Sequence, residues 1–566
     1  MTHRLKEGRR SARQEARAEG TVAPGHLLFR ARPTYIALAL LALHLLLAAA
    51  VFDPTIFTGG DNGVYVALSR AIVQRHAYIS LHDPSLAAHT YYPPGYPTIL
   101  ALASLIGIHP WVPIKLVTLA FSAAGSALAY LWLRRRTTPG IALFGGLVTA
   151  MSPGLLALSH VELSDVPFWT LATVALWALE AIPPKAWPRV VLAGLAAAAA
   201  YLTRTAAVPL IVAALGWLAL ERQWRNAILF GVLVAPAVLG WYWWTHTHAS
   251  MVYGNQFWYL DVYRPELGRA SAFDLLRRIP ENTRLYAGTM IPLLLTGQRD
   301  VGALIVLGAL VIVLGIAGWV LRLRRIGLGE LFFPLYAGML FVCPPPWAGE
   351  RYLLPIVPLT LAYGAEAVVL AMRRWRAAAV VPVGVGAFAL FLLLSAGSLL
   401  ARSQDASMCR SAYEAGARYG CLAPEWQDYL SIADWARTGL PTNAIVISRK
   451  PGLFFALSDR RGIDVPKTER PEEFFRTARQ AGARFLVLDR TDGLTTFYAV
   501  PEVLRFPTSF CLVRAGSVDG SGVLGIRLDQ PVLQAPAGQP PSIAPCPASY
   551  FAPGAEPAEF INPSTR

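Results

Sequence analysis

Long apolar stretches alternate with short polar ones along the first 400 residues of the chain. A membrane-spanning helix needs about 20 predominantly apolar residues, and most of these stretches approach that length. They cover roughly residues 34–52, 113–133, 140–158, 166–182, 189–203, 206–220, 226–245, 301–321, 330–343, 352–371 and 377–400. The pattern predicts an α-helical polytopic membrane protein with about eleven transmembrane helices.

A shorter apolar stretch, residues 97–108, decides the orientation of every later span. Cytoplasmic loops of membrane proteins carry an excess of Lys and Arg. If 97–108 lies along the interface as a helix of about a dozen residues, the basic clusters at 134–136, 322–325 and 373–376 all become cytoplasmic, as does the N-terminal tail. If it spans, most of them fall on the wrong side. We therefore expect an interfacial helix and a cytoplasmic N-terminus.

This topology gathers the polar loops on the outer face of the membrane. They are the loop 53–112, the turns 160–165 and 203–205, the long loop 246–300 and the turn 344–351. The turns on the other face are short and merely basic. An active site is therefore expected at the outer face.

Composition agrees with a membrane protein and argues against other classes. The 566 residues are 55% hydrophobic and 15% charged, with a mean hydropathy of +0.43, which excludes a purely water-soluble globule. The net charge of +15 comes from basic clusters between apolar runs, so it indicates topology and no nucleic-acid partner. Residues 1–33 form a basic cytoplasmic tail, and the long first apolar run lacks the cleavage site of a signal peptide.

The last part of the chain, residues 401–566, has the pattern of a soluble domain. An amphipathic helix ends near Gly439, a buried strand follows in "NAIVIS", and the order of a helix and then a strand repeats in "PEEFFRTARQAGARFLVLD". This alternation predicts a small extracytoplasmic α/β domain with a largely parallel sheet, after a transmembrane domain that covers 34–400. The Pro- and Ala-rich tail from about 533 is expected to be disordered.

Four of the five cysteines lie in this outer domain. Disulfides persist in oxidising compartments, so this distribution supports an extracytoplasmic location. The pairing of Cys409 with Cys421 and of Cys511 with Cys546 is preferred, with free thiols as the alternative.

Asp61 is the first candidate for chemistry. It follows Gly59 and Gly60 after the first span and opens an amphipathic segment. A helix N-terminus favours the ionised carboxylate, and such an anion can accept a proton from an attacking hydroxyl. The alternative is that Asp61 is only an N-cap, a common role of aspartate.

A second acidic element is formed by Glu162 and Asp165. On a helical turn the spacing of three places both carboxylates on one face, where they could bind a divalent cation such as Mg²⁺ or Mn²⁺, with Asp61 as a third candidate ligand. The alternative is helix capping by Ser164 or Asp165 ahead of Pro167.

Two arginines lie where the apolar helices meet the outer loops. Arg204 interrupts an apolar hairpin, and Arg351 stands in "GERYLLPIVPL". An arginine so close to the membrane is a functional candidate by default. For Arg204 the alternative is that the side chain reaches the lipid headgroups.

The first outer loop, "GGDNGVYVALSRAIVQRHAY" with "YYPPGYPTILALASLIG", resembles that of polyprenyl-phosphate-sugar-dependent glycosyltransferases of the GT-C superfamily. The likeness is closest to the family 39 branch, which includes protein O-mannosyltransferases and bacterial aminoarabinose transferases. The matching positions are Asp61, Tyr65 and the run from Pro93 to Pro97; many members have Asp-Glu where this chain has Asp61 and Asn62. The resemblance covers roughly 34–400 in topology.

The resemblance implies an inverting transfer of a monosaccharide from a polyprenyl-phosphate donor to an acceptor hydroxyl of a glycan, lipid or protein. Asp61 would be the general base, Glu162 or Asp165 would lie beside the acceptor or a metal, and Arg351, with Arg204, would hold the donor phosphate. Tyr65, Tyr92, Pro94 and Tyr96 would belong to the loop that meets donor and acceptor. The expected location is the bacterial cytoplasmic membrane. The alternative function is a lipid-linked saccharide transporter or a non-catalytic scaffold.

Overall fold

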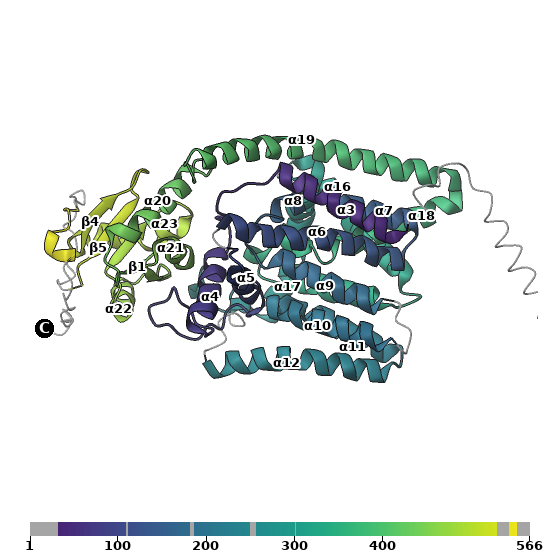
Figure 1. Ribbon diagram of the computed structural model, residues 1–566, viewed down its shortest axis with the longest axis horizontal. Helices are drawn as coiled ribbons and strands as arrows, with labels where there is room; N and C mark the ends of the chain where they lie inside the picture. The colour runs from purple at the N-terminus through teal and green to yellow at the C-terminus, as the bar shows by residue number, and fades with distance from the viewer. Residues whose placement is uncertain are drawn as a thin grey trace, which may run out of the picture.

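A bundle of long helices carries a smaller domain with a β-sheet at one end (Figure 1). This computed structural model describes residues 32–108, 111–180, 186–248, 256–299, 301–528 and 543–551. The expected basic tail 1–33 lies almost wholly outside the described residues.

The bundle has the apolar helices expected from the sequence, which confirms the membrane-protein class. Its helices are α3 (Pro33–Ala50), α6 (Trp111–Arg136), α7 (Pro139–Met151), α8 (Pro153–Leu158), α9 (Asp165–Leu179), α10 (Trp187–Thr203), α11 (Val208–Leu220), α12 (Trp224–His248), α16 (Gly302–Arg322), α17 (Leu328–Val342), α18 (Val357–Trp375) and α19 (Val380–Glu414). In the described part of the chain, five helices are long and apolar enough to cross a membrane, and six shorter ones are also apolar. The number of spans and their orientation stay predictions.

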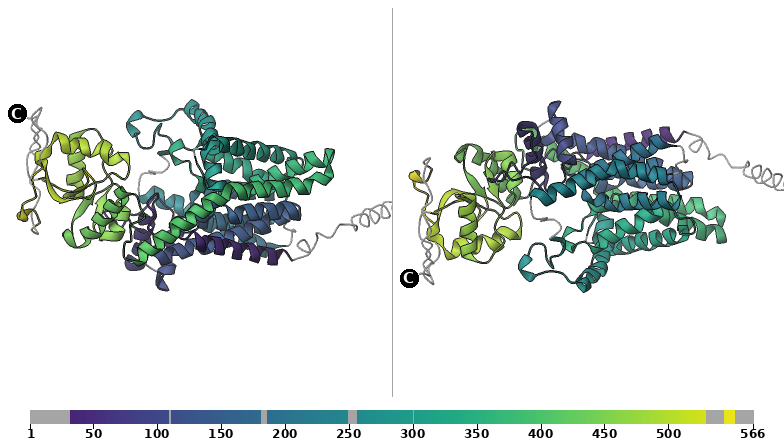
Figure 2. Two further views of the ribbon diagram at one scale, coloured as in Figure 1. Left: turned by 90° about the horizontal axis from the view of Figure 1, so that it is seen from above. Right: turned by 90° about the horizontal axis from the view of Figure 1, so that it is seen from below.

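The outer loop between α3 and α6 contains two further helices, α4 (Asn62–Arg75) and α5 (Gly95–Leu105). Both lie at the end of the bundle that faces the sheet domain (Figures 1 and 2). With 11 residues α5 is about 17 Å long, too short for a hydrocarbon core of about 30 Å. Its length suits the interfacial role predicted for 97–108.

Three elements differ from the sequence pattern. The expected span 140–158 is broken between α7 and α8, because Pro153 cannot donate a backbone hydrogen bond and disfavours a helical residue before it. The expected loop 246–300 contains α14 (Ala272–Leu285), a π-helical turn and α15 (Ile291–Thr296). Helix α19 does not stop near 400 but continues as one uninterrupted, curved helix to the sheet domain (Figure 1).

A network of ion pairs ties the helices together at the end of the bundle away from the sheet domain. Arg136 lies 2.7 Å from Glu180 and 2.6 Å from Glu330. Arg322 lies 2.9 Å from Glu330 and 2.6 Å from Glu366. Each charge faces an opposite one, as burial requires, so the network joins α6, α9, α16, α17 and α18.

The C-terminal domain contains a five-stranded sheet in the order β2-β1-β3-β5-β4. The strands are β1 (Ile445–Ile447), β2 (Arg461–Ile463), β3 (Phe485–Leu488), β4 (Phe510–Ala515) and β5 (Gly522–Ile526), with α20 (Pro424–Gly439), α21 (Pro451–Ser458), α22 (Pro471–Ala481), α23 (Gly493–Tyr498) and α24 (Val500–Arg505) around them. The α/β class is confirmed. The prediction of a largely parallel sheet was wrong, because the sheet is mixed: β1 pairs parallel with β2 and β3, while β5 pairs antiparallel with β3 and β4. The short 516–521 connection allows only an antiparallel β4–β5 pair.

Two disulfides fasten this domain, and they join the pairs preferred from the sequence. Cys409 is bonded to Cys421 and Cys511 to Cys546. The second bond corrects the expectation of a wholly disordered tail, because it holds residues 543–551 against the sheet, where the buried Tyr550 donates a 3.1 Å hydrogen bond to the Ile526 carbonyl. The remainder of that tail lies outside the described residues.

Helices α4 and α21 join the two domains by direct backbone contact. A Cβ atom added to Gly63 would lie 2.3 Å from the Leu453 Cα atom, and one added to Gly452 would lie 2.9 Å from the Val64 nitrogen. Only glycine allows backbones to approach this closely. The C-terminal domain is therefore seated on the helix that Asp61 opens.

We predict that Gly63→Ala weakens this contact. The added methyl group meets backbone atoms, which cannot rotate away, so overpacking should cost about 1 to 3 kcal/mol. The matched control is Gly140→Ala, since no atom lies within 4 Å of a Cβ atom there. Thermal unfolding in detergent, with limited proteolysis of the C-terminal domain, would show the effect; equal stability of the two variants would contradict it.

Candidate functional site

Asp61 lies at the N-cap position of α4 but does not act as a cap. Its side chain makes no hydrogen bond to the first turn of the helix, which removes the support for a purely capping role. Burial raises the pKa of the Tyr92 phenol, and the adjacent Asp61 carboxylate raises it further. The carboxylate therefore faces the loop between α4 and α5.

Lys115 of α6 holds the loop that leads to Asp61. Its ammonium donates hydrogen bonds to the carbonyl oxygens of Asp53, at 2.9 Å, and Thr55, at 2.5 Å. It also lies 3.6 Å from Glu162 Oε1. Lys115 was not among the residues predicted to be functional, although a lone lysine in the apolar run "PIKLVTLAF" is the kind of intramembrane charge that marks a site.

The structure brings Asp165, Arg204 and Arg351 together. Arg204 Nη1 lies 2.8 Å from Asp165 Oδ1, and Arg351 Nη1 lies 3.9 Å from Asp165 Oδ2. Both guanidinium groups also lie 5.0 Å from the centre of the Tyr352 ring. Asp165 is 3% exposed, whereas the arginine side chains are 18% and 23% exposed. Two cations that a ligand can reach thus share one buried carboxylate.

The first turn of α9 connects this cluster to α4. Ser164 is the N-cap residue of α9, yet its hydroxyl makes no capping bond; it lies 3.0 Å from the Tyr65 hydroxyl and accepts a 3.2 Å bond from Arg204. The capping alternative for this turn therefore lacks support. The snorkelling alternative for Arg204 also lacks support, because the guanidinium turns towards Asp165 inside the protein.

The loop residues suggested by the resemblance occupy different places. The rings of Tyr65 and Tyr92 lie 5.0 Å apart, and Tyr65 stacks edge-on against Tyr96 at the same distance. Tyr96 is fully buried, and Pro94 is the N-cap of α5. Tyr65 thus lies near both Asp61 and Arg204, and Tyr92 lies beside Asp61. Tyr96 packs against Tyr65 in the buried interior.

The C-terminal domain also reaches this site. Lys450, the residue before α21, donates hydrogen bonds of 2.8 Å to the Thr58 carbonyl and 3.2 Å to the Gly60 carbonyl. Beyond the loop, Tyr498 donates a 3.1 Å bond to the Tyr263 carbonyl. No sequence pattern indicates a role for Lys450, since its partners are backbone atoms of a distant loop.

The acidic residues do not fit a metal ion. In the part of the chain that the structure describes, no three or more His, Cys, Asp or Glu side chains are grouped to hold one. Glu162 faces Lys115, and Asp165 faces Arg204. Since each carboxylate already has a fixed cation beside it, a further cation would be repelled. The suggested Mg²⁺ or Mn²⁺ site is not supported by these residues.

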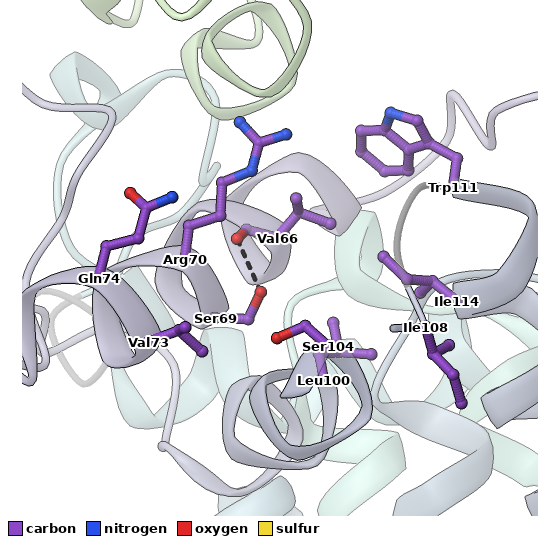
Figure 3. Close-up of a pocket in the computed structure, with 10 residues that line it drawn as sticks. All are labelled: Val66, Ser69, Arg70, Val73, Gln74, Leu100, Ser104, Ile108, Trp111 and Ile114. Carbon is purple, nitrogen blue, oxygen red and sulfur yellow. Dashed lines mark hydrogen bonds between the residues drawn. The ribbon is translucent and has the colours of Figure 1, made fainter. Parts of the chain in front are cut away.

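A cavity of about 410 Å³ lies between α4 and α5 (Figure 3). Val66, Arg70 and Leu100 are among its mostly apolar lining residues. Arg70 forms a 3.2 Å ion pair with Asp459 of the C-terminal domain. The lining includes neither Asp61 nor an arginine of the cluster, so this cavity is separate from the charged site.

Comparison with known proteins identifies the fold. Residues 91–244 match the family described as dolichyl-phosphate-mannose-protein mannosyltransferase, whereas no curated protein matches the chain. Among solved structures, ArnT from Cupriavidus metallidurans bound to undecaprenyl phosphate is similar, with a TM-score of 0.51 and 15% identity over 86% of this chain and 97% of that chain. The archaeal oligosaccharyltransferase AglB from Archaeoglobus fulgidus, in complex with an inhibitory peptide and a dolichol-phosphate, is also similar. Its TM-score is 0.50, with 14% identity over 80% of this chain and 69% of that chain.

These similarities confirm the resemblance to the GT-C superfamily that the first outer loop indicated. They also confirm the fold class: a helical membrane domain of the GT-C type, followed by a small domain with a sheet. At this level of identity the likeness establishes the fold alone.

His89 makes the loop beside the site sensitive to pH. Its Nε2 atom accepts a 3.0 Å hydrogen bond from the Tyr92 amide, and its Nδ1 atom lies 2.9 Å from the Ser80 hydroxyl. Burial and, to a smaller extent, the neighbouring His82 together lower the pKa of the imidazole to about 3. The folded state therefore binds the proton less well than the unfolded chain, whose histidine has a pKa near 6.5.

The contribution of the neutral His89 to the free energy of unfolding is fully present above about pH 6.5 and is lost as the pH falls towards 3. We predict a loss of about 2 kcal/mol between pH 7 and pH 5 from His89 alone. Thermal unfolding of His89→Gln should show a shallower pH dependence than the wild type over this range. His246→Gln, at an exposed position, serves as the control and should keep the wild-type slope; an unchanged slope in His89→Gln would contradict the prediction.

Proposed function

We propose that this protein is a membrane glycosyltransferase that moves a monosaccharide from a polyprenyl-phosphate donor to an acceptor hydroxyl, at the outer face of a bacterial cytoplasmic membrane. The observation that carries the proposal is the arrangement of Arg204 and Arg351, both partly exposed, around the buried Asp165. Ser164 connects this cluster to Tyr65 of the helix that Asp61 opens.

The cationic groups of this cluster suit an anionic ligand. Arg204 and Arg351 both lie beside the carboxylate of Asp165, and their side chains keep 18% and 23% exposure. A polyprenyl-phosphate monosaccharide is a phosphodiester with one negative charge, so its phosphate would bind at that exposed cationic surface. Guanidinium groups bind phosphate oxygens through paired donors.

The reaction follows from this placement. The Asp61 carboxylate takes the proton of the acceptor hydroxyl, and the oxygen attacks the anomeric carbon from the face opposite the phosphate. The new bond to the sugar forms as the bond from the anomeric carbon to the phosphate oxygen breaks, and the electron pair leaves on polyprenyl phosphate. The arginines stabilise the growing negative charge on the leaving group, and the configuration inverts.

The comparisons add support of a general kind. The ArnT structure holds undecaprenyl phosphate and the AglB structure holds a dolichol-phosphate, which are both polyprenyl phosphates. The matched family is named for a dolichyl-phosphate-mannose donor. A lipid-phosphate donor for this chain agrees with both.

A release assay tests the function. Purified protein in detergent, given polyprenyl-phosphate sugars and a mixed acceptor extract, should release free polyprenyl phosphate. We expect Asp61→Asn to insert and fold but to release polyprenyl phosphate at least about 100-fold more slowly, because a positioned base contributes about that much. Asp83→Asn, a change to another aspartate of the same outer loop, should keep the wild-type rate.

Two results would contradict the proposal. Wild-type release from Asp61→Asn would exclude the base. Movement of intact donor between the leaflets of a vesicle without release would favour a transporter instead.

A further inference from the structure

The loop that presents Asp61 is held from two sides by lysines of the two domains. From the membrane domain, Lys115 bonds the carbonyls of Asp53 and Thr55. From the C-terminal domain, Lys450 bonds the carbonyls of Thr58 and Gly60. Hydrogen bonds from a charged donor are stronger than those between neutral groups, so both contacts restrain the loop.

Lys450 restrains the second half of the loop. Gly59 and Gly60 have no side chains to pack, and glycine has the largest backbone freedom of any residue. The Gly60 carbonyl, one peptide before Asp61, accepts a hydrogen bond from Lys450. The backbone next to the carboxylate is therefore held by a residue 390 places further along the chain.

The surroundings show that Lys450 is directed at the loop. The preceding residue, Arg449, binds acids of its own domain, with 2.6 Å to Asp492 and 3.8 Å to Asp464. Lys450 instead extends away from its domain to the loop carbonyls, with the ring of Trp426 5.5 Å from its ammonium. Burial lowers the pKa of Lys450, and the nearby Asp61 carboxylate raises it, so the ammonium lies near the group it positions.

We propose that Lys450 is a positioning residue of the transfer reaction: it holds the Thr58–Gly60 backbone so that Asp61 faces the acceptor, and thereby makes the C-terminal domain a part of the active site. The inference rests on the proposed function. It assigns the domain a role in the rate of transfer, beyond packing against the bundle.

The test compares Lys450→Met, Lys450→Arg and Lys467→Met. Methionine keeps most of the side-chain volume but has no donor, and arginine keeps charge and donors. Lys467 is the matched control, since it is a lysine of the same domain that lies 3.9 Å from Asp464 and 5.7 Å from the Tyr263 ring. The measurements are kcat and donor KM for release of polyprenyl phosphate, and hydrogen–deuterium exchange of peptides that cover 53–62.

For Lys450→Met we expect kcat to fall about 100-fold, since a displacement of about 1 Å can cost that much, while donor KM changes less than about threefold. Amide exchange in 56–62 should become faster. Lys450→Arg should recover most of the rate and the protection, and Lys467→Met should match the wild type in both measurements.

Other outcomes overturn the inference. These are an unchanged kcat in Lys450→Met, an equal fall in Lys467→Met, a loss confined to donor KM, or unchanged exchange in 56–62. The exchange measurement does not depend on turnover. If the wild type released no polyprenyl phosphate, the proposed function would fail, whereas faster exchange in Lys450→Met would still show that Lys450 holds the loop.

Discussion

Charge buried in an apolar protein has to be matched, and this constraint organises both ends of the helical bundle. At the end away from the sheet domain, Arg136 and Glu330 are each 1% exposed and paired at 2.6 Å. At the other end, Arg204 and Arg351 retain exposed surface and share Asp165. The first arrangement is closed and stabilises helix packing. The second leaves cationic surface open, which is what an anionic substrate requires.

The outer loop links the membrane domain to the C-terminal domain through direct backbone contact between α4 and α21. Glycines at 63 and 452 let α4 and α21 touch directly, and α19 joins the bundle to the sheet domain as one uninterrupted helix (Figure 1). Disulfides stiffen the domain that supplies Lys450. A precise position for Asp61 thus depends on a folded C-terminal domain, although that domain carries no member of the arginine cluster.

The sequence predicts some parts of this molecule well for physical reasons. Apolar length locates the helices. Asp61, Asp165, Arg204 and Arg351 stand out as charges in the outer loops and turns, apart from the basic clusters that mark the other face. Lys450 does not stand out, since a lysine bonded to backbone carbonyls leaves no complementary side chain to find. Strand direction in β4 and β5 depends on the loop between them, and the order of residues 543–551 depends on a disulfide to a distant strand; neither is encoded in local periodicity.

This chain has Asn62 where many proteins of the resembled family have a glutamate, and the two hydrogen-bond acceptors beside Asn62 explain the difference. The Asn62 amide donates a 2.8 Å hydrogen bond to the Phe57 carbonyl and a 3.3 Å bond to Glu162 Oε2. A glutamate at position 62 would have no donor for either acceptor. It would also place a second negative charge beside the buried Glu162, and the nearby like charge would disfavour the ionised form of both carboxylates. Asn62, Glu162 and Lys115 therefore form one supporting set under the loop. In this chain the second acidic position is replaced by an amide that holds the first one in place.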